Sequence, residues 1–170
     1  MSLVRLSVAA FACAVVLAGC SHPPAPSERT PPFYDRLDIS GRPLDPASSL
    51  SMINQYRGNH GLPALQWDPA LARIAQAQVD DMARLDRVRS SEEAQLPAAF
   101  AAAGVSQASY LANFSAGYRT FAEAFSGWRE SKVHEATMLA PRASRVGLAT
   151  AYAPGSKYKI FWTLVVVEPR

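Results

Sequence analysis

The carboxyl-terminal segment from Tyr158 to Glu168 constrains the fold more than any other part of the chain. It reads YKIFWTLVVVE, and beyond Ile160 apolar residues occupy both alternating sets of positions. Side chains of a strand point alternately to its two faces, so this pattern is typical of a strand that is buried on both faces. The alternating segment Val146 to Tyr152 precedes it, and Pro154-Gly155 supplies a turn. Together they predict a hairpin in a sheet that is covered on both sides.

Two segments in the first half of the chain have helical patterns. The first helix is expected to begin after Ser48 or Ser49 as its cap and to end near Asn59. The second begins after Asp68, a favourable N-cap, with Pro69 at the first helical position. Its apolar stripe is predicted to contain Leu71, Ile74, Ala75, Met82 and Leu85.

The middle of the chain holds further signals. Ser90 to Glu93 offers a capping box for another helical segment, and Ser109 to Tyr118 alternates loosely enough to form a strand. Thr120 to Glu123 is a second capping box. It opens an aromatic stripe that we expect in the core, formed by Phe121, Phe125 and Trp128.

This order of elements predicts an α+β fold. Helices precede and separate the strands, and the chain closes on a hairpin rather than on repeated strand-helix-strand units, which favours a three-layer α-β-α sandwich with a central antiparallel sheet. A chain of 170 residues with 49% hydrophobic and 18% charged residues suits one globular domain. The formal net charge of +3 is small and scattered, so no nucleic-acid partner is expected.

Residues 1–19 have the pattern of a signal peptide. Arg5 is followed by the apolar run Leu6 to Leu17, which is shorter than the roughly 20 residues that a membrane-spanning helix needs. Leu17-Ala18-Gly19-Cys20 resembles the lipobox of bacterial lipoproteins, in which cleavage leaves an acylated cysteine at the new amino terminus. An ordinary cleaved secretory signal is the alternative. In the lipoprotein reading Cys20 is the only cysteine of the mature protein, because Cys13 leaves with the leader, and no disulfide forms.

Residues 20–46 are expected to form a lipidated cysteine, a tether and an irregular lead-in to a domain at 47–170. Ser21 to Pro32 contains five prolines in twelve residues, which favours an extended polyproline conformation. The membrane is therefore an expected partner through Cys20. Ser21 resembles the sorting residue of outer-membrane lipoproteins, so we expect a lipid-anchored protein of the cell envelope, on the periplasmic face of a bacterial outer membrane.

The segment from Trp128 to Ala149 is expected to form the rim of a cleft. It passes from the aromatic helix through a polar turn that carries His134 into a strand, and the Ser131 hydroxyl is expected to cap that turn. Asn54 and Arg57 lie three residues apart on the first helix. They either hydrogen-bond the loops that cross this helix or form an exposed polar face.

Several short motifs occur in an order and spacing that resemble one family. The chain resembles the CAP superfamily (cysteine-rich secretory, antigen and pathogenesis-related proteins; the SCP domain) in a bacterial form without disulfides, over about Leu50 to Val167. The resemblance implies the same α-β-α sandwich as the pattern of elements. Its motifs are Ile53-Asn54-Gln55-Tyr56-Arg57, Gly61-Leu62-Pro63-Ala64-Leu65, Asp68 to Ala83, Gly104, Asn113 to Gly117, Trp128 to His134, Val146-Gly147-Leu148-Ala149 and Phe161-Trp162.

The resemblance also implies a site in which two histidines and acidic residues face a cleft and, in some members, bind a divalent metal. His134 matches the second histidine. Ser90 stands about where the first is expected, and Ala112, just before the retained Asn113, takes the place of a glutamate. A catalytic zinc usually has three protein ligands, so no metal ligand, cofactor or catalytic residue is assigned. The candidate cleft residues are His134, Ala112, Asn113, Ser131 and Ser90.

Three functional hypotheses follow. In the first, the domain is a non-catalytic binding module for an apolar, lipid-like or peptide ligand, because replacing a glutamate by Ala112 makes a cleft drier. In the second it is a weak metal-dependent hydrolase, with Glu130 or Glu135 assisting His134. In the third it is a structural or adhesion lipoprotein with a vestigial cleft.

Overall fold

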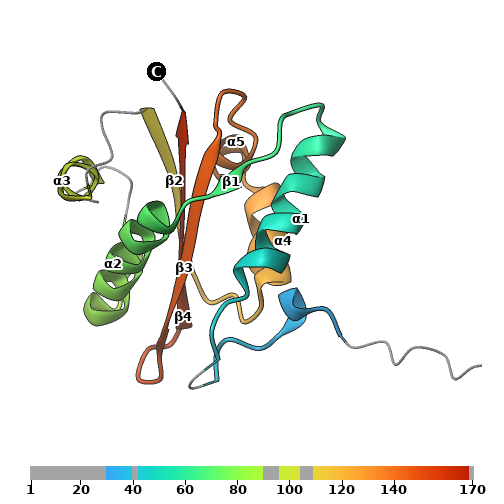
Figure 1. The fold of residues 1–170 in the computed structure, drawn as a ribbon. Helices are drawn as coiled ribbons and strands as arrows, with labels where there is room; N and C mark the ends of the chain where they lie inside the picture. Colours follow the sequence, from blue (N-terminus) through green and yellow to red (C-terminus); the bar gives the residue numbers. More distant parts are fainter. Residues whose placement is uncertain (1–29, 40–41, 90–95, 104–108, 169–170) are drawn as a thin grey trace, which may run out of the picture.

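The computed structural model describes residues 30–39, 42–89, 96–103 and 109–168. These residues form three layers, with a sheet between α2 and α3 on one side and α1, α4 and α5 on the other (Figure 1). The α+β sandwich expected from the sequence is confirmed. The elements are η1 (Pro32–Tyr34), α1 (Pro46–Asn59), β1 (Gln66–Trp67), α2 (Pro69–Leu85), α3 (Leu96–Ala102), β2 (Ser109–Ala116), α4 (Phe121–Glu130), α5 (Lys132–Met138), β3 (Arg145–Ala153) and β4 (Lys159–Glu168).

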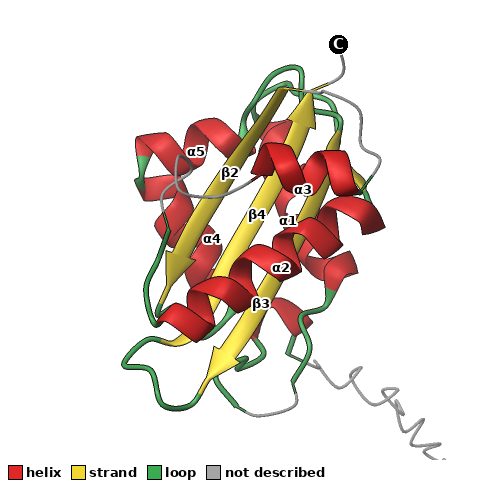
Figure 2. Cartoon of the chain, turned by 90° about the vertical axis from the view of Figure 1, so that its left-hand side faces the viewer, coloured by secondary structure: helices red, strands yellow, loops and turns green. Residues whose placement is uncertain are grey.

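The sheet has the strand order β1-β3-β4-β2, which places β4 in its interior. Every residue from Ile160 to Val167 is at most 1% exposed, because α2 crosses one face of the sheet while α1 and α4 cover the other (Figures 1 and 2). The prediction of a strand with two buried faces is confirmed. β4 pairs antiparallel with both β3 and β2. The two-residue β1 adds a parallel pairing to β3 that the sequence pattern did not predict.

Two apolar clusters lie on opposite faces of the sheet. The predicted stripe of α2 packs on one face together with Phe100 of α3, except for Leu85, which is 39% exposed at the last turn of the helix. The aromatic stripe of α4 fills the other cluster, as predicted. There the rings of Trp128 and Trp162 meet edge to face with centroids 6.3 Å apart, so α4 is wedged directly against β4.

Gly147 in β3 permits the closest approach between α2 and the sheet. A Cβ atom at this position would lie 2.2 Å from the backbone carbonyl carbon of Leu71. Backbone cannot rotate away as the end of a flexible side chain can, so the packing of α2 on β3 requires a residue without a side chain here.

Acidic caps set the first turns of α1 and α2. The Asp68 side chain accepts hydrogen bonds from the amides of Ala70 and Leu71, as predicted. The cap of α1 is Asp45, which accepts from the Ser48 amide, so the expectation of Ser48 or Ser49 as cap was wrong. The reason is that Asp45-Pro46 repeats the combination of cap and first-turn proline seen in Asp68-Pro69.

The lead-in before α1 belongs partly to the core. Leu37 is 3% exposed, and its amide donates to the carbonyl of Arg119 at a distance of 2.8 Å. This contact holds the lead-in against the loop that precedes α4. Among the residues that the structure describes, no helix is both long and apolar enough to cross a bilayer.

Candidate functional site

Two hydrogen bonds from β2 hold the junction of α4 and α5 against the sheet. Asn113 donates through Nδ2 to the carbonyl of His134 at 2.9 Å, and Ser115 accepts from Nε1 of Trp128 at 3.0 Å. Residues two apart on a strand share one face, so Asn113 and Ser115 both point toward the helical layer. The side chains on this face of β2 therefore fix the position of α5.

His134 lies within α5, and not in a polar turn as the sequence analysis expected. Ser131 separates α4 from α5 and occupies the N-cap position, but its hydroxyl makes no capping hydrogen bond. The helix begins instead with the bond from the Glu135 amide to the Ser131 carbonyl, at 2.8 Å. The chain can continue from one helix to the next here because one extended residue is enough to redirect it.

A shallow apolar hollow of about 470 Å³ lies between the start of α5 and β2. Leu111 and Val133 form opposite walls and are 42% and 75% exposed, and Lys132 is the only charged one among the described lining residues. We name this feature the β2–α5 hollow, after the two elements that bound it. It is lined by Tyr110, Leu111, Ala112, Lys132, Val133, Ala136 and Thr137.

The sequence candidates take different places around this hollow. Ala112 lines it, whereas Asn113 and His134 lie beside it and are joined by the hydrogen bond given above. Ser131 lies at the helix junction, outside the lining. Ser90, like the lipidation candidate Cys20, lies outside the described residues. Leu111 and Val133 were not among the candidates from the sequence, where nothing distinguishes them from other apolar residues.

Two polar groups next to the hollow have no partner among the described residues. The Oδ1 atom of Asn113 is fully buried and accepts no hydrogen bond. The His134 ring is half-buried, and burial lowers its pKa, so the imidazole is neutral at pH 7. Neither residue belongs to the lining of the hollow, and the Asn113 side chain is shielded from it by burial.

Glu135 points away from this border. Its carboxylate accepts a hydrogen bond of 2.5 Å from the Tyr56 hydroxyl of α1, and this bond raises the pKa of Tyr56. Glu130 is exposed on the last turn of α4. Within the part of the chain that the structure describes, no three His, Cys, Asp or Glu side chains are grouped as metal ligands would be.

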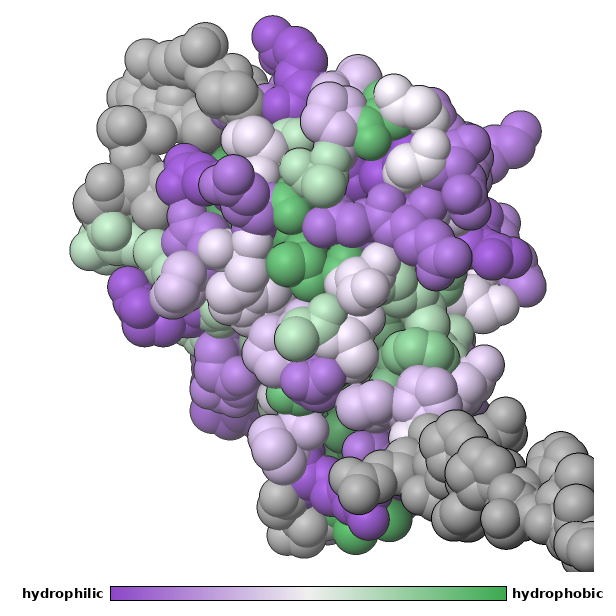
Figure 3. Space-filling model, turned by 45° about the vertical axis from the view of Figure 1, so that its right-hand side comes forward, coloured by the Kyte–Doolittle hydropathy of each residue, from purple (hydrophilic) through white to green (hydrophobic). Residues whose placement is uncertain are grey.

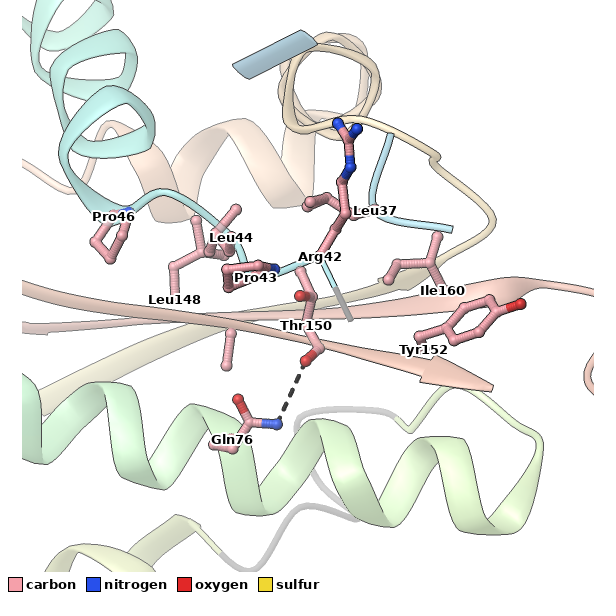
Figure 4. A pocket seen from close by; sticks show the side chains of 11 residues that line it. Leu37, Arg42, Pro43, Leu44, Pro46, Gln76, Leu148, Thr150, Tyr152 and Ile160 are labelled. Atoms are coloured by element: carbon pink, nitrogen blue, oxygen red, sulfur yellow. Dashed lines mark hydrogen bonds between the residues drawn. The ribbon is translucent and has the colours of Figure 1, made fainter. Parts of the chain in front are cut away.

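A second hollow, of about 270 Å³, lies at the opposite sheet edge (Figure 4). It is bounded by Pro43 and Leu44 of the lead-in and by β3, and Gln76 of α2 donates to the carbonyl of Thr150 at 3.3 Å. None of the sequence candidates within the described residues lines it. On the face where α1 and α4 come forward, hydrophobic residues surface only as a broken strip between hydrophilic ones (Figure 3).

Arg57 and Asn54 fix the loops that end the helical layer. The Arg57 guanidinium is fully buried and donates to the carbonyls of Pro63, Met138 and Ala140 at 2.7 to 3.0 Å, with a longer bond to Ala143 at 3.3 Å. Asn54 exchanges two hydrogen bonds with the backbone of Leu65. Both residues therefore bind crossing loops, and the alternative of an exposed polar face is wrong.

The comparison with protein families agrees with this architecture. The profile of the cysteine-rich secretory protein family, CAP, matches residues 50–166. The chain belongs to this family. No curated protein sequence matches it significantly.

Solved structures show the same fold at low sequence identity. An outer surface protein from Borrelia burgdorferi has a TM-score of 0.64 at 12% identity, over 76% of this chain and 99% of that one. An extracellular SCP-domain protein from Bacillus anthracis has a TM-score of 0.58 at 22% identity, over 75% of this chain and 45% of that one. A cysteine-rich secretory protein from Staphylococcus aureus has a TM-score of 0.57 at 16% identity, over 72% and 38%. The chain thus matches less than half the length of the last two.

Proposed function

We propose that this protein is a lipid-anchored CAP-domain protein of the cell envelope that binds an apolar, lipid-like or peptide ligand without chemically changing it. The observation that carries the proposal is the β2–α5 hollow, whose lining includes the apolar residues Leu111, Val133 and Ala136. Sites for small ligands are mostly apolar with a few polar groups that fix orientation. Here the lining residues with polar side chains are Tyr110, Lys132 and Thr137.

The chemistry of the described side chains favours binding over hydrolysis. A zinc ion that activates water usually has three protein ligands, and the carboxylate next to His134 in sequence is already hydrogen-bonded by Tyr56. General acid-base work by His134 alone would lack a group that orients the imidazole. A binding role requires neither further metal ligands nor a group that orients the His134 imidazole.

The envelope location is part of the proposal. It is supported by the lipobox-like sequence ending at Cys20 and by the proline-rich segment before the lead-in. The Borrelia burgdorferi and Bacillus anthracis proteins of the same fold are described as outer surface and extracellular. Cys20→Ser should abolish incorporation of radiolabelled palmitate and release the protein from membrane pellets, whereas retention of the label would contradict acylation at Cys20.

Ligand binding is tested with two probes, labelled palmitate and a pool of short apolar peptides. Val133→Asp introduces a charge into the hollow at a side chain that is 75% exposed, so the fold should tolerate it. We expect at least one probe to bind the unaltered protein and Val133→Asp to weaken that binding about tenfold, a loss of roughly 1.4 kcal/mol. Ala136→Trp, which fills the hollow from an exposed position of α5, should act in the same direction.

Ile39→Asp is the matched control, because Ile39 is an exposed apolar residue of the lead-in, 48% accessible and outside the lining of the hollow. Equal affinities for Val133→Asp and Ile39→Asp, or no binding of either probe, would reject the hollow as the site. Zinc-dependent hydrolysis that disappears in His134→Ala would replace the binding role by the enzymatic one.

A further inference from the structure

The outer edge of β2 pairs with no other described strand, and the direction of its backbone hydrogen-bonding groups is defined. β2 is the last strand in the sheet order, and among the described residues only β4 pairs with it (Figure 2). The Gly117 amide donates to the carbonyl of Ile160 at 2.9 Å, which directs the backbone groups of residue 117 toward β4. Because this direction alternates along a strand, the N–H and C=O groups of Tyr110, Ala112 and Phe114 point away from β4, to the open side.

Unlike the outer edge of β2, the opposite edge of the sheet is protected. β1 pairs with the start of β3, and further along the strand the outward carbonyl of Thr150 is occupied by the side chain of Gln76. For β2, the part of the chain that the structure describes supplies no backbone partner on the open side. The strand SYLANFSA also lacks the charged residues and prolines by which natural edge strands discourage pairing.

The open edge and the β2–α5 hollow coincide. Tyr110 and Ala112, whose backbone groups face outward, both line the hollow, and Val133 forms its opposite wall. A chain that paired with this edge would place alternate side chains on the face that Leu111 shares, and one of them would enter the hollow. The backbone edge and the apolar hollow are therefore suited to the same occupant.

We propose that the occupant is an extended peptide segment of a partner protein, which adds a strand to β2 and inserts an apolar side chain between Leu111 and Val133. The alternating donors and acceptors of Tyr110 and Ala112 match a polypeptide in extended conformation and have no counterpart in an acyl chain. Lys132 is the only charged residue among the described residues of the lining, so the segment carries an acidic residue close to its apolar one. This inference rests on the proposed binding function and names its ligand class.

The test uses the full chain, extracted from membranes in mild detergent, and one synthetic probe. The probe is a blocked peptide of alternating valine and threonine with one aspartate. Its control is the same peptide with methyl groups on alternate backbone nitrogens, which removes the donors of one edge and keeps every side chain. We expect the methylated peptide to bind at least about tenfold more weakly, since it loses several backbone hydrogen bonds.

Ala112→Pro is the matching change in the protein. The Ala112 amide points to the open side, so proline removes an outward donor without breaking the ladder to β4, and an edge strand accepts proline in this orientation. We expect about a tenfold loss of peptide affinity. Amide exchange at Tyr110, Ala112 and Phe114 should slow when the peptide binds, while Leu111 and Asn113 are already protected by β4.

The possible results distinguish strand addition by a peptide from the more general proposal that the hollow binds a ligand. Equal binding of the methylated and unmethylated peptides, or peptide affinity of Ala112→Pro within about twofold of the unaltered protein, overturns strand addition. If palmitate binding is then still weakened by Val133→Asp, the binding function stands and only the peptide is rejected. A dimer that the peptide does not dissociate would show that a second copy covers the edge, and would also overturn the inference.

Discussion

The side-chain amide of Asn113 donates a hydrogen bond to the backbone carbonyl of His134, and this contact joins the edge strand β2 to α5. Asn113 is fully buried, and its second polar atom, Oδ1, faces no described partner. The contact therefore does two things at once. It sets the position of the helix that forms one wall of the hollow, and it leaves an acceptor beside that wall.

Replacing Asn113 by Ala should loosen α5 without unfolding the domain. The partly buried His134 carbonyl would lose its side-chain donor, so we expect the free energy of unfolding to fall by about 1 to 3 kcal/mol. Hydrogen exchange of the α5 amides should accelerate. Gln55→Ala, at an exposed amide of α1, is the control and should stay within about 0.5 kcal/mol. Equal exchange rates in α5 for both variants would contradict the proposed role of Asn113.

Replacing Arg57 by Met should be among the most damaging single changes in the chain. Methionine keeps the apolar stem but removes the donors to four backbone carbonyls, so we expect a loss of more than about 3 kcal/mol in urea unfolding. Arg57→Lys should not restore stability, because an ammonium group cannot reproduce the planar fork. Arg84→Met, at a side chain that is 67% exposed, controls for the general effect of losing an arginine. A cost below about 1 kcal/mol for Arg57→Met would contradict this picture.

Stability should depend on pH through His134. Burial lowers the pKa of the folded-state imidazole below its ordinary value of 6.5, so the unfolded chain takes up a proton at a higher pH than the folded one. The stability contributed by the neutral ring is thus present above pH 6.5 and is lost as the pH falls below this value. The unaltered protein should lose more unfolding free energy on acidification than His134→Gln does. A titration midpoint above 6.5 for the His134 ring in proton NMR would reverse the sign and refute the prediction.

Replacing Gly147 by Ala should push α2 away from the sheet. The added methyl carbon would lie 2.2 Å from the Leu71 carbonyl carbon, so backbone must move, and overpacking of this kind costs about 1 to 3 kcal/mol. The change should appear as a lower midpoint in thermal unfolding. Gly58→Ala in α1 is the control, because an added Cβ there meets nothing within 4 Å, and it should be neutral or slightly stabilising. Similar midpoints for Gly147→Ala and the unaltered protein would show that α2 does not pack as closely as the structure has it.

Local patterns predicted the parts of the fold that depend on neighbours in sequence. The Asp68-Pro69 start of α2 and the aromatic stripe of α4 are confirmed, because capping and helical periodicity are properties of a few consecutive residues. The start of α1 was misplaced although Asp45-Pro46 carries the same signal. The helical position of His134 was missed, since a seven-residue helix that begins one residue after another leaves almost no boundary signal.

The candidate site shows the limit of the sequence more clearly. The sequence singled out Ala112 and His134, but whether Asn113 would reach the backbone of α5, or Glu135 would turn toward Tyr56, depended on contacts between residues far apart in the chain. Val133 and Leu111 are unremarkable apolar residues in the sequence. They became candidates only when the fold left them exposed on opposite sides of one hollow.

The sequence by itself determined the layered architecture, because the doubly apolar strand from Ile160 to Val167 can be buried only between two covers. It also determined most element types and the family. Only the tertiary structure decided which strand edge stays open and which side chains surround the hollow beside it. The physical reason is that strand order and the packing of α5 depend on hydrogen bonds and contacts between distant residues, which no local pattern encodes.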